Sequence, residues 1–134
     1  YKDENVTVEA FKVRHGTWPN AFGYRFTTPD RVIVISGDTA PTPALEKYSR
    51  DADILIHPAY SAAGLASSSP AWQKYMRDNH TSTLELAELA SAVKPKLLVL
   101  YHVLFLGTTE SDLISEIKQN YDGVVILATD RDVY

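Results

Sequence analysis

The chain has 134 residues, 45% of them hydrophobic, which suits one domain, or part of one, with a packed core. Its formal net charge of -4 argues against a non-specific grip on nucleic acid, which needs clustered lysine and arginine. Because the chain has no cysteine, disulfides, zinc fingers and thiol catalysis are excluded, and any metal ion must be held by His, Asp or Glu.

The sequence contains no apolar run near the roughly 20 residues of a membrane span, so we expect no membrane partner. It shows no signal peptide and begins at Tyr1 instead of Met, so we expect a truncated or processed product. The compartment is therefore open: cytoplasmic, or exported if a signal peptide precedes Tyr1. The oligomeric state is open as well, and a homo-oligomer is one alternative.

The first third of the chain predicts three strands. Residues 6–14 alternate apolar and polar side chains, and residues 22–27 form a second short strand. After a turn at residues 28–30, residues 31–36 are almost continuously apolar, as in a strand that is buried on both faces.

Helices and strands alternate after this point. Thr42 followed by Pro43 predicts a helix start, and residues 53–57 predict a buried strand. Residues 61–69 are small and polar and predict a mobile loop. Pro70 opens a helix that we expect to run through Met76.

The remaining elements follow the same alternation. Ser82 and Glu85 fit a capping box for a helix that ends at Lys94-Pro95. Residues 97–100 and 124–128 predict buried strands on either side of a helix at 110–120. Without an internal repeat or linker, this order predicts an α/β layered fold.

Several polar residues stand at the predicted carboxyl ends of strands, where layered α/β folds bind ligands. They are His15, Asp38, His57, His102 and Asp130. Any one of them alone is more often a capping or hydrogen-bonding residue. Taken together, His15, Asp38 and His102 offer two imidazoles and one carboxylate, a suitable ligand set for a divalent metal ion.

Asp38 and His80 each allow two interpretations. Asp38 stands in a Gly-Asp-Thr sequence that suits a turn, but a half-buried carboxylate there would need a partner and could bridge two cations. His80 lies just outside a predicted helix start, whose partial positive charge disfavours protonation of an imidazole. His80 is then either a neutral proton shuttle or an exposed residue beside a cap.

Five segments in this order resemble the metallo-β-lactamase superfamily, and within it the ribonuclease Z-like branch. They are HGTWPNAFGYR, SGDT, DILIHPAY, NHTSTLELAELA and LLVLYH, and the resemblance extends from about Val6 to Asp130. It implies a four-layer αββα sandwich built from two similar halves, of which residues 1–134 form the C-terminal half. This half comprises a mixed sheet with flanking helices.

The resemblance also implies roles for single residues. His15 and His102 match metal ligands, and Asp38 matches a carboxylate that bridges two metal ions. The implied cofactor is a pair of divalent ions, with zinc as first choice and manganese or iron as alternatives. His80 matches a catalytic histidine beside the scissile phosphate, which stabilises or protonates it.

Two departures from the family's pattern qualify this interpretation. His57 matches the histidine of a His-Glu-Ala motif whose Glu supports the catalytic histidine, but Pro58 replaces that Glu. The His-x-His-x-Asp-His signature, which carries most of the first metal site, is absent from the chain. We therefore expect the N-terminal half of the domain as a necessary partner, and no turnover from this fragment alone.

The sequence leaves three functional hypotheses. The first is a metal-dependent hydrolase that activates water at a dinuclear centre and cleaves an ester, a lactone or a phosphodiester. The second is a degenerate, non-catalytic module of the same fold that serves binding or assembly. The third is an RNA-processing enzyme, against which the acidic balance and Pro58 both count. In an enzyme, Trp18, Phe22 and residues 61–69 would line the substrate cleft, although both aromatic residues also suit a core.

Overall fold

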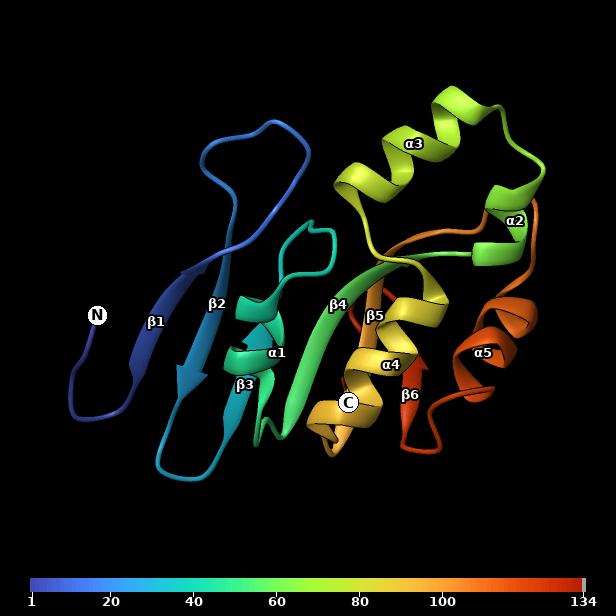
Figure 1. The fold of residues 1–134 in the computed structure, drawn as a ribbon. Coiled ribbons are helices and arrows are strands. Elements are labelled where there is room, and N and C mark those ends of the chain that lie inside the picture. The colour runs from blue at the N-terminus through green and yellow to red at the C-terminus, as the bar shows by residue number, and fades with distance from the viewer. Residues whose placement is uncertain (134) are drawn as a thin grey trace.

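The computed structural model describes residues 1–133 and contains one six-stranded sheet whose strands lie in chain order (Figure 1). β1, β2 and β3 pair antiparallel, whereas β3 to β6 pair parallel. The strands are β1 (Thr7–Lys12), β2 (Phe22–Thr27), β3 (Val32–Ile35), β4 (Ile54–Tyr60), β5 (Leu97–Leu104) and β6 (Val125–Leu127). The four parallel strands therefore end at the same edge of the sheet, and the loops that follow them converge there.

Within residues 1–133, five helices connect these strands, and two of them start at the predicted capping residues Thr42 and Ser82. Thr42 accepts a hydrogen bond from the Leu45 N–H, and Ser82 forms the predicted capping box with Glu85. Both caps satisfy N–H groups that a first helical turn leaves unpaired. The helices are α1 (Pro43–Ser49), α2 (Ala62–Ala66), α3 (Pro70–Asn79), α4 (Thr83–Val93) and α5 (Glu110–Lys118).

The hydrophobic core lies between the sheet and the layer formed by α1, α4 and α5 (Figure 1). Val34, Leu55 and Leu98 stand side by side on neighbouring strands and are completely buried. Leu86 from α4 and Ile117 from α5 are equally buried above them. Burying each such side chain contributes about 1.5–3 kcal/mol, so this layer holds the sheet and its loops in place.

The next row of paired residues points to the opposite face of the sheet, which we call the open face. It consists of Tyr24, Ile35, Ile56, Val99 and Ile126. Tyr24 is 43% exposed, and of the other four only Val99 is fully buried. The described residues thus leave an apolar face of the sheet partly open to solvent.

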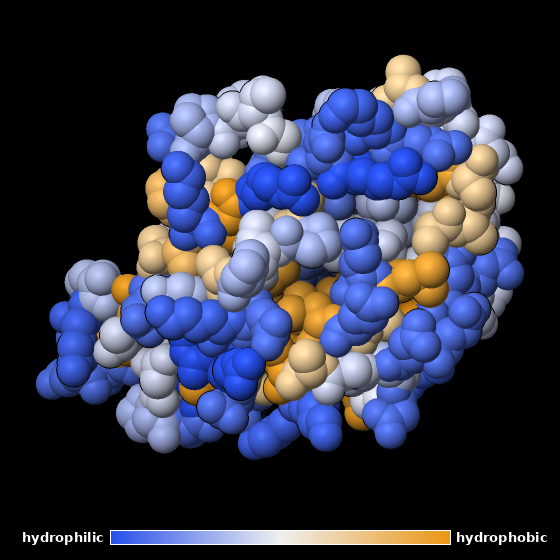
Figure 2. All heavy atoms as spheres, in the orientation of Figure 1, coloured by the Kyte–Doolittle hydropathy of each residue, from blue (hydrophilic) through white to orange (hydrophobic). Residues whose placement is uncertain are grey.

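The outer face of the helical layer is mainly hydrophilic, and hydrophobic atoms surface between α1 and α4 (Figure 2). There Leu45, Leu89 and Ala92 share a pocket of about 480 Å³ with three glutamates of the two helices. None of the described helices combines the length and hydropathy that crossing a bilayer requires.

The prediction of a mobile loop at residues 61–69 is wrong. Residues 62–66 form α2 because Ser61 caps its start by accepting a hydrogen bond from Gly64, and because Leu65 is buried against a second, smaller core cluster. Composition alone does not predict this helix, because most of its residues are small.

Three predicted elements are longer than expected. α3 continues to Asn79 instead of Met76. β5 continues from residue 100 to Leu104, so the placement of His102 at a strand end is wrong: His102 lies inside the strand. β4 continues to Tyr60, so the placement of His57 at a strand end is wrong: His57 lies inside the strand. Pro58 fits there because β3 pairs with β4 only as far as Ile56, so the missing N–H breaks no bond to β3.

A buried carboxylate joins three helices below the convergent edge. Glu116 of α5 accepts hydrogen bonds from the Ser61 hydroxyl (2.7 Å), the Ala62 N–H (2.9 Å) and the Thr83 hydroxyl. These donors lie at the starts of α2 and α4. Glu116 therefore fixes the positions of both starts relative to α5.

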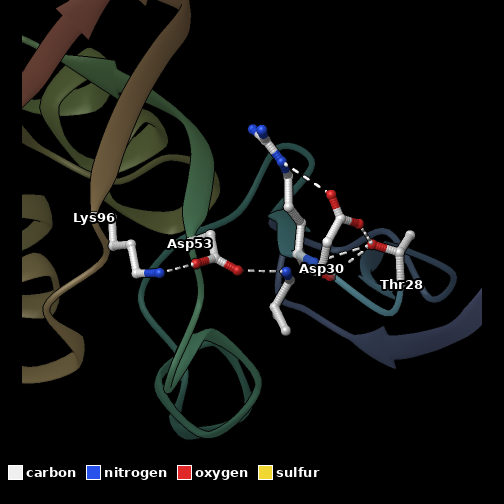
Figure 3. A network of polar contacts seen from close by, with 6 residues as sticks. Thr28, Asp30, Asp53 and Lys96 are labelled. Carbon is white, nitrogen blue, oxygen red and sulfur yellow. Dashed lines mark hydrogen bonds and ion pairs between the residues drawn. The ribbon is translucent and has the colours of Figure 1, made fainter.

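A second polar network closes the opposite edge of the sheet (Figure 3). Asp53 pairs with Lys96 at 2.6 Å and accepts a hydrogen bond from the Val32 N–H at 2.7 Å. The hydrogen bond from Lys96 is the main cause that lowers the pKa of Asp53 below its usual value. The network links the starts of β3, β4 and β5.

Candidate metal centre

Three connecting segments converge beyond the carboxyl ends of the strands and bring His15, Asp38 and His80 together. One ligand atom from each of these residues lies within 4.8 Å of the others. His102 of β5 joins the group, with its Nε2 3.5 Å from an Asp38 carboxylate oxygen. All four predicted site residues therefore lie in one cluster, and His80 lies as close to Asp38 as a metal ligand would.

The three segments are tied to each other by hydrogen bonds next to the candidate residues. The Thr81 hydroxyl donates to the Thr39 carbonyl at 2.7 Å, which joins the segments of His80 and Asp38. The Ala40 N–H donates to the Arg14 carbonyl at 2.7 Å, which joins the segments of Asp38 and His15. The three segments are thus joined by hydrogen bonds from groups other than the candidate side chains.

His15 is oriented by a backbone carbonyl. Its Nδ1 lies 2.8 Å from the Asn79 oxygen, and because a carbonyl only accepts, Nδ1 must carry the proton. The lone pair of Nε2 is then available to a metal ion, as in most metal-binding histidines. The sequence offers no signal for Asn79, because a backbone atom acts there.

Gly16 permits this orientation. It adopts φ +55°, and its N–H donates to the Asp78 carbonyl at 3.0 Å. A Cβ at this position would lie 2.2 Å from the Asn79 Oδ1, too close for any side chain. Glycine therefore lets the loop after β1 approach the end of α3, so that His15 can reach the cluster.

His80 is buried between two other imidazoles, with ring centres 5.2 Å from His15 and 6.1 Å from His102. Its pKa is lowered, mainly by burial and further by His15 and His102, while Asp38 opposes the shift. The position of His80 beside a helix start predicts the same direction for its pKa, but burial is the leading cause. A neutral imidazole suits a metal ligand or a hydrogen-bond donor.

Asp38 and His102 face each other at the open side of the cluster. Asp38 is half-buried and follows Gly37, whose φ of +65° turns the chain away from β3. His102 has φ +46°, a left-handed conformation that non-glycine residues adopt infrequently. Such strain amounts to roughly 1–3 kcal/mol and collects at functional sites.

His57 lies outside the cluster, on the helix-covered face of the sheet. Its Nδ1 lies 2.5 Å from the Pro58 carbonyl, and its Nε2 is buried without a hydrogen-bond partner among the described residues. Burial lowers its pKa to about 4, so His57 is neutral near pH 7. Asp130, the other predicted strand-end residue, is exposed and is not part of the metal-ligating group.

The carboxylate that would support His80 in the family's motif has no counterpart among the described residues. The nearby carboxylates have other partners: Glu85 caps α4, and Glu116 binds the Ser61 and Thr83 hydroxyls. Within residues 1–133, no carboxylate forms a hydrogen bond with the His80 ring. Tyr75 is the remaining ring beside it, at 6.3 Å.

The chain is similar in sequence and in fold to known proteins. Residues 1–103 match the family described as a beta-lactamase superfamily domain. The chain is 34% identical to ribonuclease Z of Myxococcus xanthus and 32% identical to ribonuclease Z of Haloarcula marismortui, each over 103 residues. These matches cover 76% of this chain but only 32% and 31% of the relatives, so the chain spans about a third of their length.

Two solved structures share the fold over the whole chain. The metallo-beta-lactamase fold protein YhfI from Bacillus subtilis superposes with a TM-score of 0.78 at 22% identity, and the chain covers 51% of it. The short form of human tRNase Z superposes with a TM-score of 0.69 at 27% identity, and the chain covers 43% of it. The mixed sheet with helices on one face is therefore the architecture of this fold.

Proposed function

Since the chain belongs to the beta-lactamase superfamily domain family, we propose that the full-length protein is a metal-dependent hydrolase whose substrate is a phosphodiester of RNA. The observation that carries the proposal is the cluster of His15, Asp38 and His80 within 4.8 Å, with His102 beside Asp38. The acidic balance and Pro58 count against RNA, but the ribonuclease Z relatives make RNA the first substrate to test.

The donor set fits a divalent metal ion. The proton on His15 Nδ1 leaves Nε2 free to bind, and the lowered pKa of His80 keeps that ring neutral. Imidazole and carboxylate without thiolate suit zinc, with manganese or iron as alternatives. His15, Asp38 and His102 would hold such ions. Bound there, the ions would lower the pKa of a water molecule and polarise the scissile phosphoryl group.

The protein's own groups would orient the reaction. The hydrogen bond from the Thr81 hydroxyl to the Thr39 carbonyl keeps the segments of Asp38 and His80 side by side. The neutral His80 suits donation of a hydrogen bond to the charge that develops on the phosphate more than full proton transfer. The left-handed backbone conformation of His102 directs its imidazole toward Asp38.

A second half-domain would complete the site. The apolar open face matches a sandwich in which another sheet packs on this one, at the usual spacing of about 10 Å between sheets. The ligands missing from this chain would then come from the other half. We therefore assign turnover to the full-length protein and none to residues 1–134 alone.

A non-catalytic module of the same fold is the second candidate, and one observation favours it. His80 has no supporting carboxylate, because Pro58 stands where the family's motif has Glu and no described carboxylate takes its place. A protein that kept the fold for assembly alone would lose metal affinity together with this support.

Replacing Asp38 tests the enzyme proposal. In the full-length protein, Asp38→Ala should lower kcat for cleavage of a short RNA by at least about a thousandfold, because it removes the carboxylate that would hold the ions. Asp130→Ala is the matched control, since Asp130 is exposed and outside the metal-ligating group. Full turnover by the Asp38 variant would refute the role of this centre.

A further inference from the structure

A pocket of about 420 Å³ lies beside the candidate metal centre and is lined by residues 14–18 and by residues of α3. Figure 1 shows the loop after β1 next to α3. Arg14, Trp18, Tyr75 and Asp78 line it, together with Asn79, whose carbonyl orients His15. Its volume falls within the roughly 300–1,000 Å³ typical of small-ligand sites. A group bound in this pocket would therefore be a direct neighbour of a group bound at the cluster.

Aromatic rings form much of the wall of this pocket. Trp18 is 69% exposed and Tyr75 is 47% exposed, although large aromatic side chains are usually buried. Trp72 stacks on Tyr75 with ring centres 5.1 Å apart and planes 16° apart, so the Tyr75 ring is supported from one side. On the cluster side, the Tyr75 ring lies 6.3 Å from His80. The wall is thus a supported, exposed aromatic surface that reaches the site.

The positively charged side chain of Arg14 lines the same pocket. The backbone of Arg14 is held at both ends, by the Thr39 hydroxyl and the Ala40 N–H, while its side chain is exposed. Among residues 1–133, no hydrogen bond or ion pair of its guanidinium is found. The nearby Asp78 is already paired with Lys74, so it does not neutralise Arg14.

We propose that this pocket binds one unpaired nucleobase of an RNA strand. The phosphodiester to be cleaved in that strand would lie at the candidate metal centre. The base would stack on Tyr75 and Trp18, and Arg14 would bind a phosphate next to that base. The proposal rests on the proposed function and narrows its substrate to a single-stranded segment. Bases in a duplex keep their faces stacked on one another, whereas an unpaired base offers its face to aromatic side chains.

Steady-state cleavage and equilibrium binding by the full-length protein test this subsite. The probes are a labelled single-stranded RNA oligonucleotide and versions of it with one abasic nucleotide at each position. Tyr75→Ala should raise KM and Kd roughly tenfold or more and leave kcat nearly unchanged, because stacking on one base is lost. Tyr75→Trp should restore binding, since it keeps an aromatic face on the same exposed position of α3.

The abasic series identifies the contact. At one position, loss of the base should weaken binding by the wild-type protein as much as Tyr75→Ala does, and the variant should lose nothing further there. Tyr1→Ala is the matched control, because Tyr1 is 79% exposed and precedes β1, away from the pocket. An unchanged Kd for Tyr75→Ala would overturn the base subsite. It would also be overturned if the losses of affinity from Tyr75→Ala and from the abasic nucleotide were additive at every position of the RNA.

The failure of the subsite and the failure of the proposed function give different results. If Asp38→Ala abolishes RNA cleavage while Tyr75→Ala changes nothing, the hydrolase stands and the subsite is refuted. If the wild-type protein neither binds nor cleaves RNA, the proposed function and the base subsite are both refuted. If Tyr75→Ala raises KM only for bis(4-nitrophenyl) phosphate, the pocket holds an aromatic leaving group and the assignment of a nucleobase is overturned.

Discussion

At the scale of single residues, the candidate centre depends on how a few side chains are oriented. The Asn79 carbonyl sets the tautomer of His15, and Gly16 allows the close approach that makes this contact. The sequence predicts that His15, Asp38 and His102 converge, because it places each of them at the carboxyl end of a strand. For His102 this basis is wrong, since β5 runs on to Leu104, but its side chain still faces Asp38. The part of Asn79 is not predictable in this way, since it depends on how α3 packs against a distant loop.

His57 leads to a prediction about pH. Burial lowers its pKa to about 4 from an ordinary 6.5. Between these pH values the unfolded chain takes up a proton that the folded protein does not. The stabilisation is therefore complete above about pH 6.5 and is lost as the pH falls toward 4, by up to about 3 kcal/mol in all.

Urea unfolding of the full-length protein at several pH values measures this loss. We expect a flatter dependence on pH for His57→Leu, which has nothing to protonate at that buried position. Lys47→Leu serves as a control, because this residue of α1 is exposed and does not titrate in that range. Identical slopes for the wild-type protein and His57→Leu would show that His57 is not the responsible group.

At the scale of elements, local signals account for what the sequence predicts well. The caps at Thr42 and Ser82 lie within four residues of the N–H groups that they satisfy, so the starts of α1 and α4 can be read directly. α2 is missed because its stability comes from tertiary contacts, namely burial of Leu65 and the hydrogen bonds from Ser61 to Glu116 and Leu104.

Glu116 provides the test at this scale. Glu116→Ala should lower the free energy of unfolding by roughly 3 kcal/mol, because two hydroxyls and one N–H lose their charged acceptor in a buried place. Glu116→Gln keeps one acceptor oxygen and should lose less. Chemical denaturation of the full-length protein measures both, with Glu88→Ala on the exposed face of α4 as control. A loss no larger than that of Glu88→Ala would contradict the network's structural role.

At the scale of the whole molecule, one face of the sheet is covered by helices and the other is open. The alternation of strands and helices predicts the covered face, because the buried row at Val34, Leu55 and Leu98 consists of apolar residues in every strand. The row of the open face is equally apolar, so composition alone does not distinguish the two faces. The proposal of a second half-domain accounts for both the open face and the incomplete ligand set.

The metal content of the purified full-length protein tests the central claim most directly. We expect close to two divalent ions per chain in the wild-type protein by plasma mass spectrometry. His15→Ala and Asp38→Ala should each lose at least one ion, whereas His57→Leu should lose none. A wild-type protein purified without metal that also fails to take up zinc, manganese or iron would contradict the metal centre and favour the non-catalytic module.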